Sequence, residues 1–217
     1  MRNLQHWSML LSPTNHTAIR EAIEHVYGLC GETPGALLTE DDLKCHLFHR
    51  LSSLPAFSAP VPTLDSHIAA TPVHAEVSWF DAKKKLTVKP DITILDPEHL
   101  SLLYKIGSVK APPSKHFHFA GQAFIFELKF IRGPKGITGP KLKAIKRDFE
   151  KIEKLFTKLK ADGDGDNVFC FFVVFSRFGV VCDAWNEFIQ VHSNSTHWEL
   201  IYKSLDVALP QYVSRPR

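Results

Sequence analysis

The stretch that decides the fold is Ala123-Phe124-Ile125-Phe126-Glu127-Leu128-Lys129-Phe130. Its aromatic and branched residues predict a buried β-strand, yet Glu127 and Lys129 put a carboxylate and an amine inside it. Such charges are costly unless they are paired, hydrogen-bonded or bound to a metal ion. Because side chains along a strand alternate between faces, Glu127 and Lys129 point the same way. The strand therefore predicts either a functional pair or a structural ion pair.

A second carboxylate comes from an apolar segment upstream. Asp91 follows Pro90 and precedes Ile92-Thr93-Ile94-Leu95, a run that is typical of a strand. Two carboxylates and a lysine on adjacent strands can hold a divalent cation and activate a water molecule beside it. We therefore expect Asp91, Glu127 and Lys129 to meet at one site.

The remaining elements follow a simple order along the chain. Apolar periodicity predicts helices over residues 14–29, 39–51 and 141–160, and strands over residues 74–80, 86–95, 123–130 and 168–175. Thr14 or Asn15 is expected to cap the first helix, and Thr39 to cap the second in a capping box with Asp42. The order helix, helix, three strands, helix, strand predicts an α/β sandwich with a mixed sheet.

Length and composition predict one domain. The chain has 217 residues, of which 44% are apolar, enough for a buried core. We expect this core at about residues 39–176, a helical N-terminal extension at 1–38, and further C-terminal elements at 177–217. The four cysteines show no CxxC pairing and predict reduced thiols. With no signal peptide and no apolar segment of about 20 residues, we expect a cytoplasmic protein without a membrane partner.

Charge is concentrated after the apolar strand. Residues 129–160 hold eleven Lys and Arg side chains against three acidic ones, an excess of +8 in a chain whose net charge is +3. A basic block beside a carboxylate site indicates a polyanionic substrate. The alternative is that the lysines only solvate the outer face of a helix.

The pattern Pro90-Asp91 followed by Glu127-Leu128-Lys129 resembles the PD-(D/E)XK nuclease superfamily, which includes many restriction endonucleases and DNA-repair nucleases. The predicted element order is similar to that family's core: an N-terminal helix, a three-strand meander carrying Asp and then ExK, a helix and a further strand. The resemblance covers the chain from about Thr39 to Phe175. It implies a restriction-endonuclease-like α/β/α sandwich with a central mixed β-sheet. It also implies a metal-dependent nuclease that hydrolyses phosphodiester bonds of DNA, restriction-like or repair-like.

The resemblance implies a role for each motif residue. Asp91 and Glu127 would ligate Mg²⁺, for which Mn²⁺ could substitute, and the backbone carbonyl of Leu128 would add an oxygen ligand. Lys129 would position or help deprotonate the attacking water and offset charge at the phosphorus. The family often adds a catalytic glutamate from the first core helix, and Glu40 is the candidate here. The alternative for Glu40 is a carboxylate that favours the helix dipole.

Six basic residues after the motif predict phosphate contacts that position nucleic acid without reading its sequence. They are Arg132, Lys135, Lys141, Lys143, Lys146 and Arg147. The expected partner is DNA, and the resemblance to restriction enzymes suggests a homodimer. The alternative function is a catalytically silent nuclease-fold module that binds nucleic acid or a protein partner.

One departure from the family pattern is the long gap of 35 residues between Asp91 and Glu127. It predicts an insertion at about residues 97–118, with a short helix expected over 98–106. The insertion carries basic and histidine side chains that could contact substrate or form an unrelated surface excursion: Lys105, Lys110, Lys115, His116 and His118.

Overall fold

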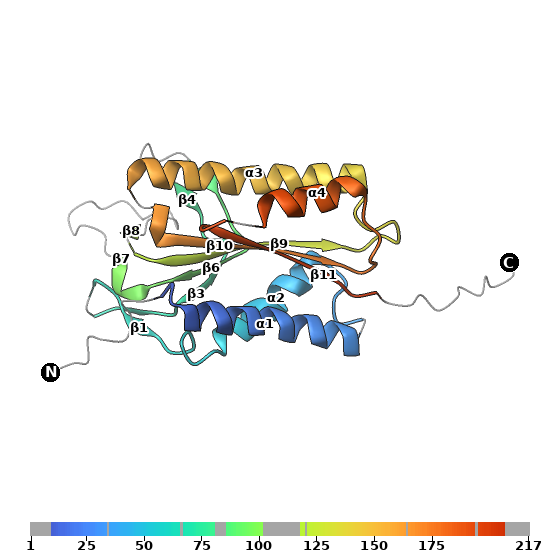
Figure 1. Ribbon diagram of the computed structural model, residues 1–217. Coiled ribbons are helices and arrows are strands. Elements are labelled where there is room, and N and C mark those ends of the chain that lie inside the picture. The colour runs from blue at the N-terminus through green and yellow to red at the C-terminus, as the bar shows by residue number, and fades with distance from the viewer. Residues whose placement is uncertain are drawn as a thin grey trace, which may run out of the picture.

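A mixed sheet of five strands runs through the centre of the protein (Figure 1). The computed structural model describes residues 10–33, 35–65, 67–80, 86–101, 118–119, 121–163, 165–193 and 195–206. The strands lie in the order β11-β10-β9-β6-β3. Their bounds are Val73–Ala75 (β3), Ile92–Leu95 (β6), Ala123–Ile131 (β9), Val168–Ser176 (β10) and Trp198–Ser204 (β11).

The connections between strands explain why the sheet is mixed. β10 is parallel to both β9 and β11, whereas β6 is antiparallel to both β9 and β3. Parallel neighbours need a crossover connection. Helix α3 (Gly139–Asp162) links β9 to β10, and α4 (Asp183–His192) links β10 to β11.

The helices cover the sheet on two sides (Figure 1). α3 and α4 lie over one face, and α1 (Pro13–Glu32) and α2 (Glu40–Ser52) lie over the other. The described part of the chain is therefore a three-layered α/β structure with four α-helices, which confirms the predicted α/β class. Among the described residues, no helix is long and apolar enough to cross a membrane.

Burial along β9 fixes the direction of its side chains. Its even-numbered residues, Phe124, Phe126, Leu128 and Phe130, enter the apolar core shared with α1 and α2. Ala123, Ile125 and Ile131 enter the second core, shared with α3 and α4. A register slip of one residue would exchange the two faces and bury both charges among the phenylalanines. Glu127 and Lys129 therefore face the α3 side.

The basic helix forms as its periodicity predicts. The apolar residues of α3 pack on the sheet, and the helix extends the predicted range 141–160 by two residues at each end. Pro140 fits the first turn, where its missing N–H costs nothing. Gly163 ends the helix with φ of 86°, a left-handed conformation that glycine adopts without strain.

The predicted hairpin of residues 74–80 and 86–95 is wrong in one respect, because each of its strands is broken in two. β3 and β6 pair within the main sheet, while β4 (Trp79–Phe80) and β5 (Leu86–Val88) form a separate ribbon. Glu76 interrupts the first strand with φ of 56°. Pro90 interrupts the second, since it has no N–H for a sheet ladder. Asp91 consequently stands at the break, directly before β6.

The other differences are local. Ser12 caps α1 in place of Thr14 or Asn15, because Pro13 takes the first helical position. The capping box of Thr39 and Asp42 is confirmed. The remaining short elements are β1 (Val61–Pro62), β2 (Ala69–Ala70), β7 (Leu100–Ser101), β8 (His118–Phe119) and the 3₁₀ turns Pro97–His99 and Gly165–Asn167.

The insertion is described only at its ends. A 3₁₀ turn and the two-residue strand β7 occupy residues 97–101, where the sequence predicts the first half of a helix over 98–106. Residues 102–117, with Lys105, Lys110, Lys115 and His116, lie outside the described residues.

Candidate active site

The candidate site lies along the part of β9 that has no paired strand on the β6 side. β6 pairs with β9 only from Ala123 to Phe126, so the next residues of β9 have no strand on that side. Two carboxylates take the place of the missing strand. Asp91 Oδ2 accepts a hydrogen bond from the N–H of Leu128 at 2.8 Å. Glu40 Oε2 accepts one from the N–H of Phe130 at 3.2 Å. Asp91 and Glu40 are thus held side by side along one strand edge.

The backbone of Asp91 is fixed on both sides. Its N–H donates to the carbonyl of Phe126 at 2.9 Å, and its carbonyl accepts from the N–H of Glu76 at 3.1 Å. Pro90 restricts the chain just before it. The break in the two strands therefore aims the Asp91 carboxylate along the free edge of β9 and away from the ladder.

Glu40 is positioned by the start of α2. Thr39 caps the helix, so Glu40 occupies its first turn. The turn before it is tied to the sheet: Arg177 donates to the Leu37 carbonyl at 2.7 Å, and Arg132 donates to the Leu38 carbonyl at 3.5 Å. These contacts bring a residue from the N-terminal part of the chain to the end of β9.

Lys129 lies at the centre of the carboxylates. Its Nζ is 2.9 Å from Glu127 Oε1, 3.3 Å from Asp148 Oδ2 and 3.6 Å from Glu40 Oε1. An ammonium has three N–H donors, so three carboxylates can saturate it. The side chains of Glu127, Lys129 and Asp148 are only 13–15% exposed, while that of Glu40 is 44% exposed. The site is therefore partly buried, with its open side at Glu40.

Burial and neighbouring charges shift the pKa values of the side chains at the site. Burial raises the pKa of Glu127 to about 7, although the Lys129 ammonium opposes the shift. Burial also raises the pKa of Asp91, against the hydrogen bond from Leu128. Burial acts to lower the pKa of Lys129, but Glu127, Glu40 and Asp148 together raise it. With all groups ionised, the four carboxylates of the site outnumber the two ammoniums that contact them, those of Lys129 and Lys151, so the site favours a further cation.

The site offers oxygen atoms of the type that Mg²⁺ prefers as ligands. Among the described residues, no three His, Cys, Asp or Glu side chains are grouped to hold a metal ion. Mg²⁺, however, is bound in proteins by one or two carboxylates together with water and substrate phosphate. Asp91 and Glu127 supply that number. The N–H of Leu128 donates a hydrogen bond to Asp91 at the free edge of β9, and the carbonyl of Leu128 points to the same edge. These oxygens fit the chemistry of Mg²⁺.

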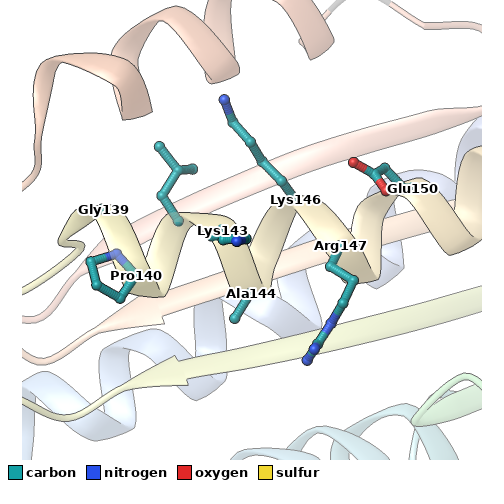
Figure 2. A pocket seen from close by; sticks show the side chains of 8 residues that line it. Gly139, Pro140, Lys143, Ala144, Lys146, Arg147 and Glu150 are labelled. Atoms are coloured by element: carbon teal, nitrogen blue, oxygen red, sulfur yellow. The ribbon is translucent and has the colours of Figure 1, made fainter.

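The predicted basic residues are exposed, but they do not all lie together. Lys143, Lys146 and Arg147 line a surface depression of about 540 Å³ on α3 (Figure 2). Lys146 and Arg147 point away from each other there, and Lys146 Nζ lies 5.5 Å from the centre of the Phe188 ring on α4.

The other three predicted contacts are not among the residues that line this depression. Lys141 is exposed in the first turns of α3, and Lys135 is exposed in the turn that precedes the helix. Arg132 is also exposed, although one of its N–H groups is used within the chain, at the Leu38 carbonyl. The basic surface therefore extends along α3 and the turn before it.

Asp148 is the site residue that sequence reasoning missed. It appeared there only as one of three acids in a basic block. Its position gives a usable signal, because it lies three residues after Ile145 and four before Ile152, on the apolar stripe of the helix. An acidic residue on such a stripe indicates a partner across the interface, which in this protein is Lys129.

Comparison of the chain with known proteins gives no match. No protein-family model matches the sequence, and no curated protein and no solved structure is significantly similar to it. The candidate site therefore stands on the residues and geometry of this chain alone.

Proposed function

We propose that this protein is a metal-dependent nuclease of the PD-(D/E)XK type, with a restriction-endonuclease-like fold, that hydrolyses phosphodiester bonds of DNA. The observation that carries the proposal is the pair of carboxylates, Asp91 and Glu40, on the free edge of β9 beside Glu127 and Lys129. The element order α2, β3, β6, β9, α3, β10 supports it, because the resemblance implies this order. Asp91 directly precedes the middle strand of the meander, β6, and the Glu-Leu-Lys motif lies on the third, β9.

Each side chain has a role that follows from its place. Asp91, Glu127 and the Leu128 carbonyl would hold Mg²⁺, with Mn²⁺ as a substitute. When bound, such a cation polarises the scissile phosphate and lowers the pKa of a coordinated water. Lys129 orients the attacking water and offsets the negative charge that develops on the phosphate oxygens. Glu40, at the open side, would accept a hydrogen bond from that water.

The basic surface supports a nucleic acid substrate. Lys143, Lys146 and Arg147 lie on the helix whose inner side contributes Asp148 to the site. Exposed lysine and arginine side chains neutralise phosphates without regard to base sequence. DNA, held along α3 by these side chains, is the proposed substrate.

A second candidate is a nuclease-fold module without turnover. The observation that favours it is the saturated ammonium of Lys129, because three carboxylate partners are also what a structural ion-pair cluster would provide. Such a module would bind nucleic acid or a protein partner and leave phosphodiester bonds intact.

One experiment separates the two candidates. The protein is incubated with plasmid, single-stranded DNA and RNA in Mg²⁺, Mn²⁺ or EDTA, together with Asp91→Asn, Glu127→Gln and Lys129→Met. Glu187→Gln, an exposed residue of α4, is the matched charge control. If the protein is a nuclease, wild type and Glu187→Gln should cut in the presence of metal, and the three site variants should not. Absence of cutting with either metal, or equal cutting by the site variants, would overturn the nuclease; salt-sensitive binding without cutting would support the module.

A further inference from the structure

Helix α3 contributes a carboxylate to the lysine of the candidate site. Asp148 Oδ2 lies 3.3 Å from Lys129 Nζ, and Asp148 Oδ1 accepts a hydrogen bond from Lys151 Nζ at 2.6 Å. Both oxygens of Asp148 are therefore engaged. Burial acts to raise the pKa of Asp148, but Lys151 and Lys129 bring it below its ordinary value, so the group is a carboxylate at neutral pH.

The three partners of Lys129 are not equivalent. Glu127 lies on β9, and Glu40 of α2 accepts a hydrogen bond at the free edge of that strand, beside the proposed metal. Asp148 comes from α3, the helix that covers the face of the sheet toward which Glu127 and Lys129 point. A metal ion that takes Glu127 competes with the ammonium for the same carboxylate oxygens. Asp148 is the partner that the ammonium keeps.

From this arrangement we infer that Asp148 is a positioning residue, which acts on the metal site through Lys129. The ammonium lies 2.9 Å from Glu127 and 3.3 Å from Asp148, so Asp148 gives it a second carboxylate to pair with when a divalent cation takes Glu127. Lys151 holds Asp148 in place from the solvent side. The inference rests on the proposed function, because it assigns Asp148 a task at the same site.

Mn²⁺ alone is the probe, and its dissociation constant is measured by titration calorimetry without nucleic acid. We expect Asp148→Asn to raise this constant about tenfold, the usual size of effect when a group that orients a metal ligand is altered. Asp148→Glu, which keeps the charge, restores most of the affinity. Glu153→Gln is the control, because it removes one negative charge from the next turns of α3, where Glu153 is near His192.

A double-mutant cycle separates positioning from the electric field of one removed charge. Lys129→Met keeps the apolar stem of the side chain and removes the ammonium. If Asp148 acts through Lys129, adding Asp148→Asn to Lys129→Met changes the Mn²⁺ affinity by less than about twofold. A change of that size is within the scatter to which independent effects add. An equal loss of affinity in both backgrounds would overturn the inference.

The outcomes distinguish this inference from the proposed function. If wild type binds Mn²⁺ and cuts DNA while Asp148→Asn behaves like Glu153→Gln, the inference on Asp148 fails and the nuclease stands. If wild type neither binds Mn²⁺ nor cuts, the proposed function fails and the role of Asp148 fails with it. A tenfold effect that disappears in the Lys129→Met background supports both.

Discussion

The carboxylate of Asp91 accepts a hydrogen bond from the backbone of Leu128 at 2.8 Å, across 37 positions of the sequence. This contact joins the residue before one strand to the middle of its neighbour, beyond the point where the two strands stop pairing. The N–H of Leu128 would otherwise be a partly buried donor without an acceptor. Asp91 consequently has a structural task as well as a proposed chemical one.

Asp91 variants are expected to separate these two tasks. Asp91→Ala removes the acceptor for Leu128, and an unsatisfied donor costs about 1–3 kcal/mol of unfolding free energy. Asp91→Asn keeps an acceptor oxygen and removes the buried charge, so its stability in urea is expected to equal or exceed that of wild type. Both variants are expected to lose cleavage. Retention of cleavage by Asp91→Asn would contradict a metal-ligand role.

The raised pKa of Glu127 predicts how stability depends on pH without metal. The folded carboxyl binds its proton up to about pH 7, whereas the unfolded one loses it near 4.5. Between these values the folded state binds more protons, so the contribution of Glu127 to stability is largest at low pH and declines as pH rises through this window. Urea unfolding in EDTA should show this decline in wild type, and a weaker one in Glu127→Gln. An identical pH dependence would contradict the raised pKa.

A bound divalent metal ion should counteract the loss of folding stability at high pH. A cation that binds the ionised carboxylates stabilises the folded state, and more strongly where Glu127 is ionised. We therefore expect Mg²⁺ to raise the midpoint of thermal unfolding more at pH 8 than at pH 5.5. Glu127→Gln should show no such difference, and Ca²⁺ tests whether any divalent ion suffices. A metal effect that is the same at both pH values would argue against binding at Glu127.

The cap of α2 provides a test of Glu40. Thr39→Ala removes the capping hydrogen bond at a cost of about 1 kcal/mol and loosens the turn that carries Glu40. We expect this variant, like Glu40→Gln, to lower the turnover rate. Ser12→Ala removes the N-cap of α1 at a similar cost in stability, with no path to the site. Equal turnover by Thr39→Ala and Ser12→Ala would place Glu40 outside the reaction.

The basic surface of α3 is tested by the salt dependence of binding. Lys143→Ala and Arg147→Ala are each expected to weaken DNA binding. Each should also lower the slope of log K against log salt by about 1 for every phosphate that the variant no longer neutralises. Lys160→Ala changes an exposed lysine in the last turn of the same helix and serves as control. Unchanged slopes in fluorescence anisotropy would show that DNA takes another path.

The sequence predicts those parts of the fold that burial patterns determine. The apolar runs of β9 and β10 and the periodicity of α3 place the sheet and one covering helix, and the pair Glu127 and Lys129 follows from strand alternation. The roles of these residues stay predictions.

Other features depend on tertiary packing and leave little trace in the sequence. The turn at Glu76 has a positive φ at a residue that gives no local signal for it. Asp148 can be assigned a partner only after α3 has been placed over β9. Glu40 reaches Phe130 from 90 positions away, a contact that no local pattern encodes.

The hydrogen bond from Arg177 to the Leu37 carbonyl spans 140 positions. It ties the residue after β10 to the turn that precedes α2, and so links the two ends of the core. Closing a loop of this length costs more entropy than closing a short one, so contacts of such separation slow folding. A chain still emerging from the ribosome lacks this tie until Arg177 has been made, so one of the two contacts that hold the turn before Glu40 is missing. If the site is the proposed nuclease centre, we expect no cleavage by the nascent protein until β10 and Arg177 have been synthesised.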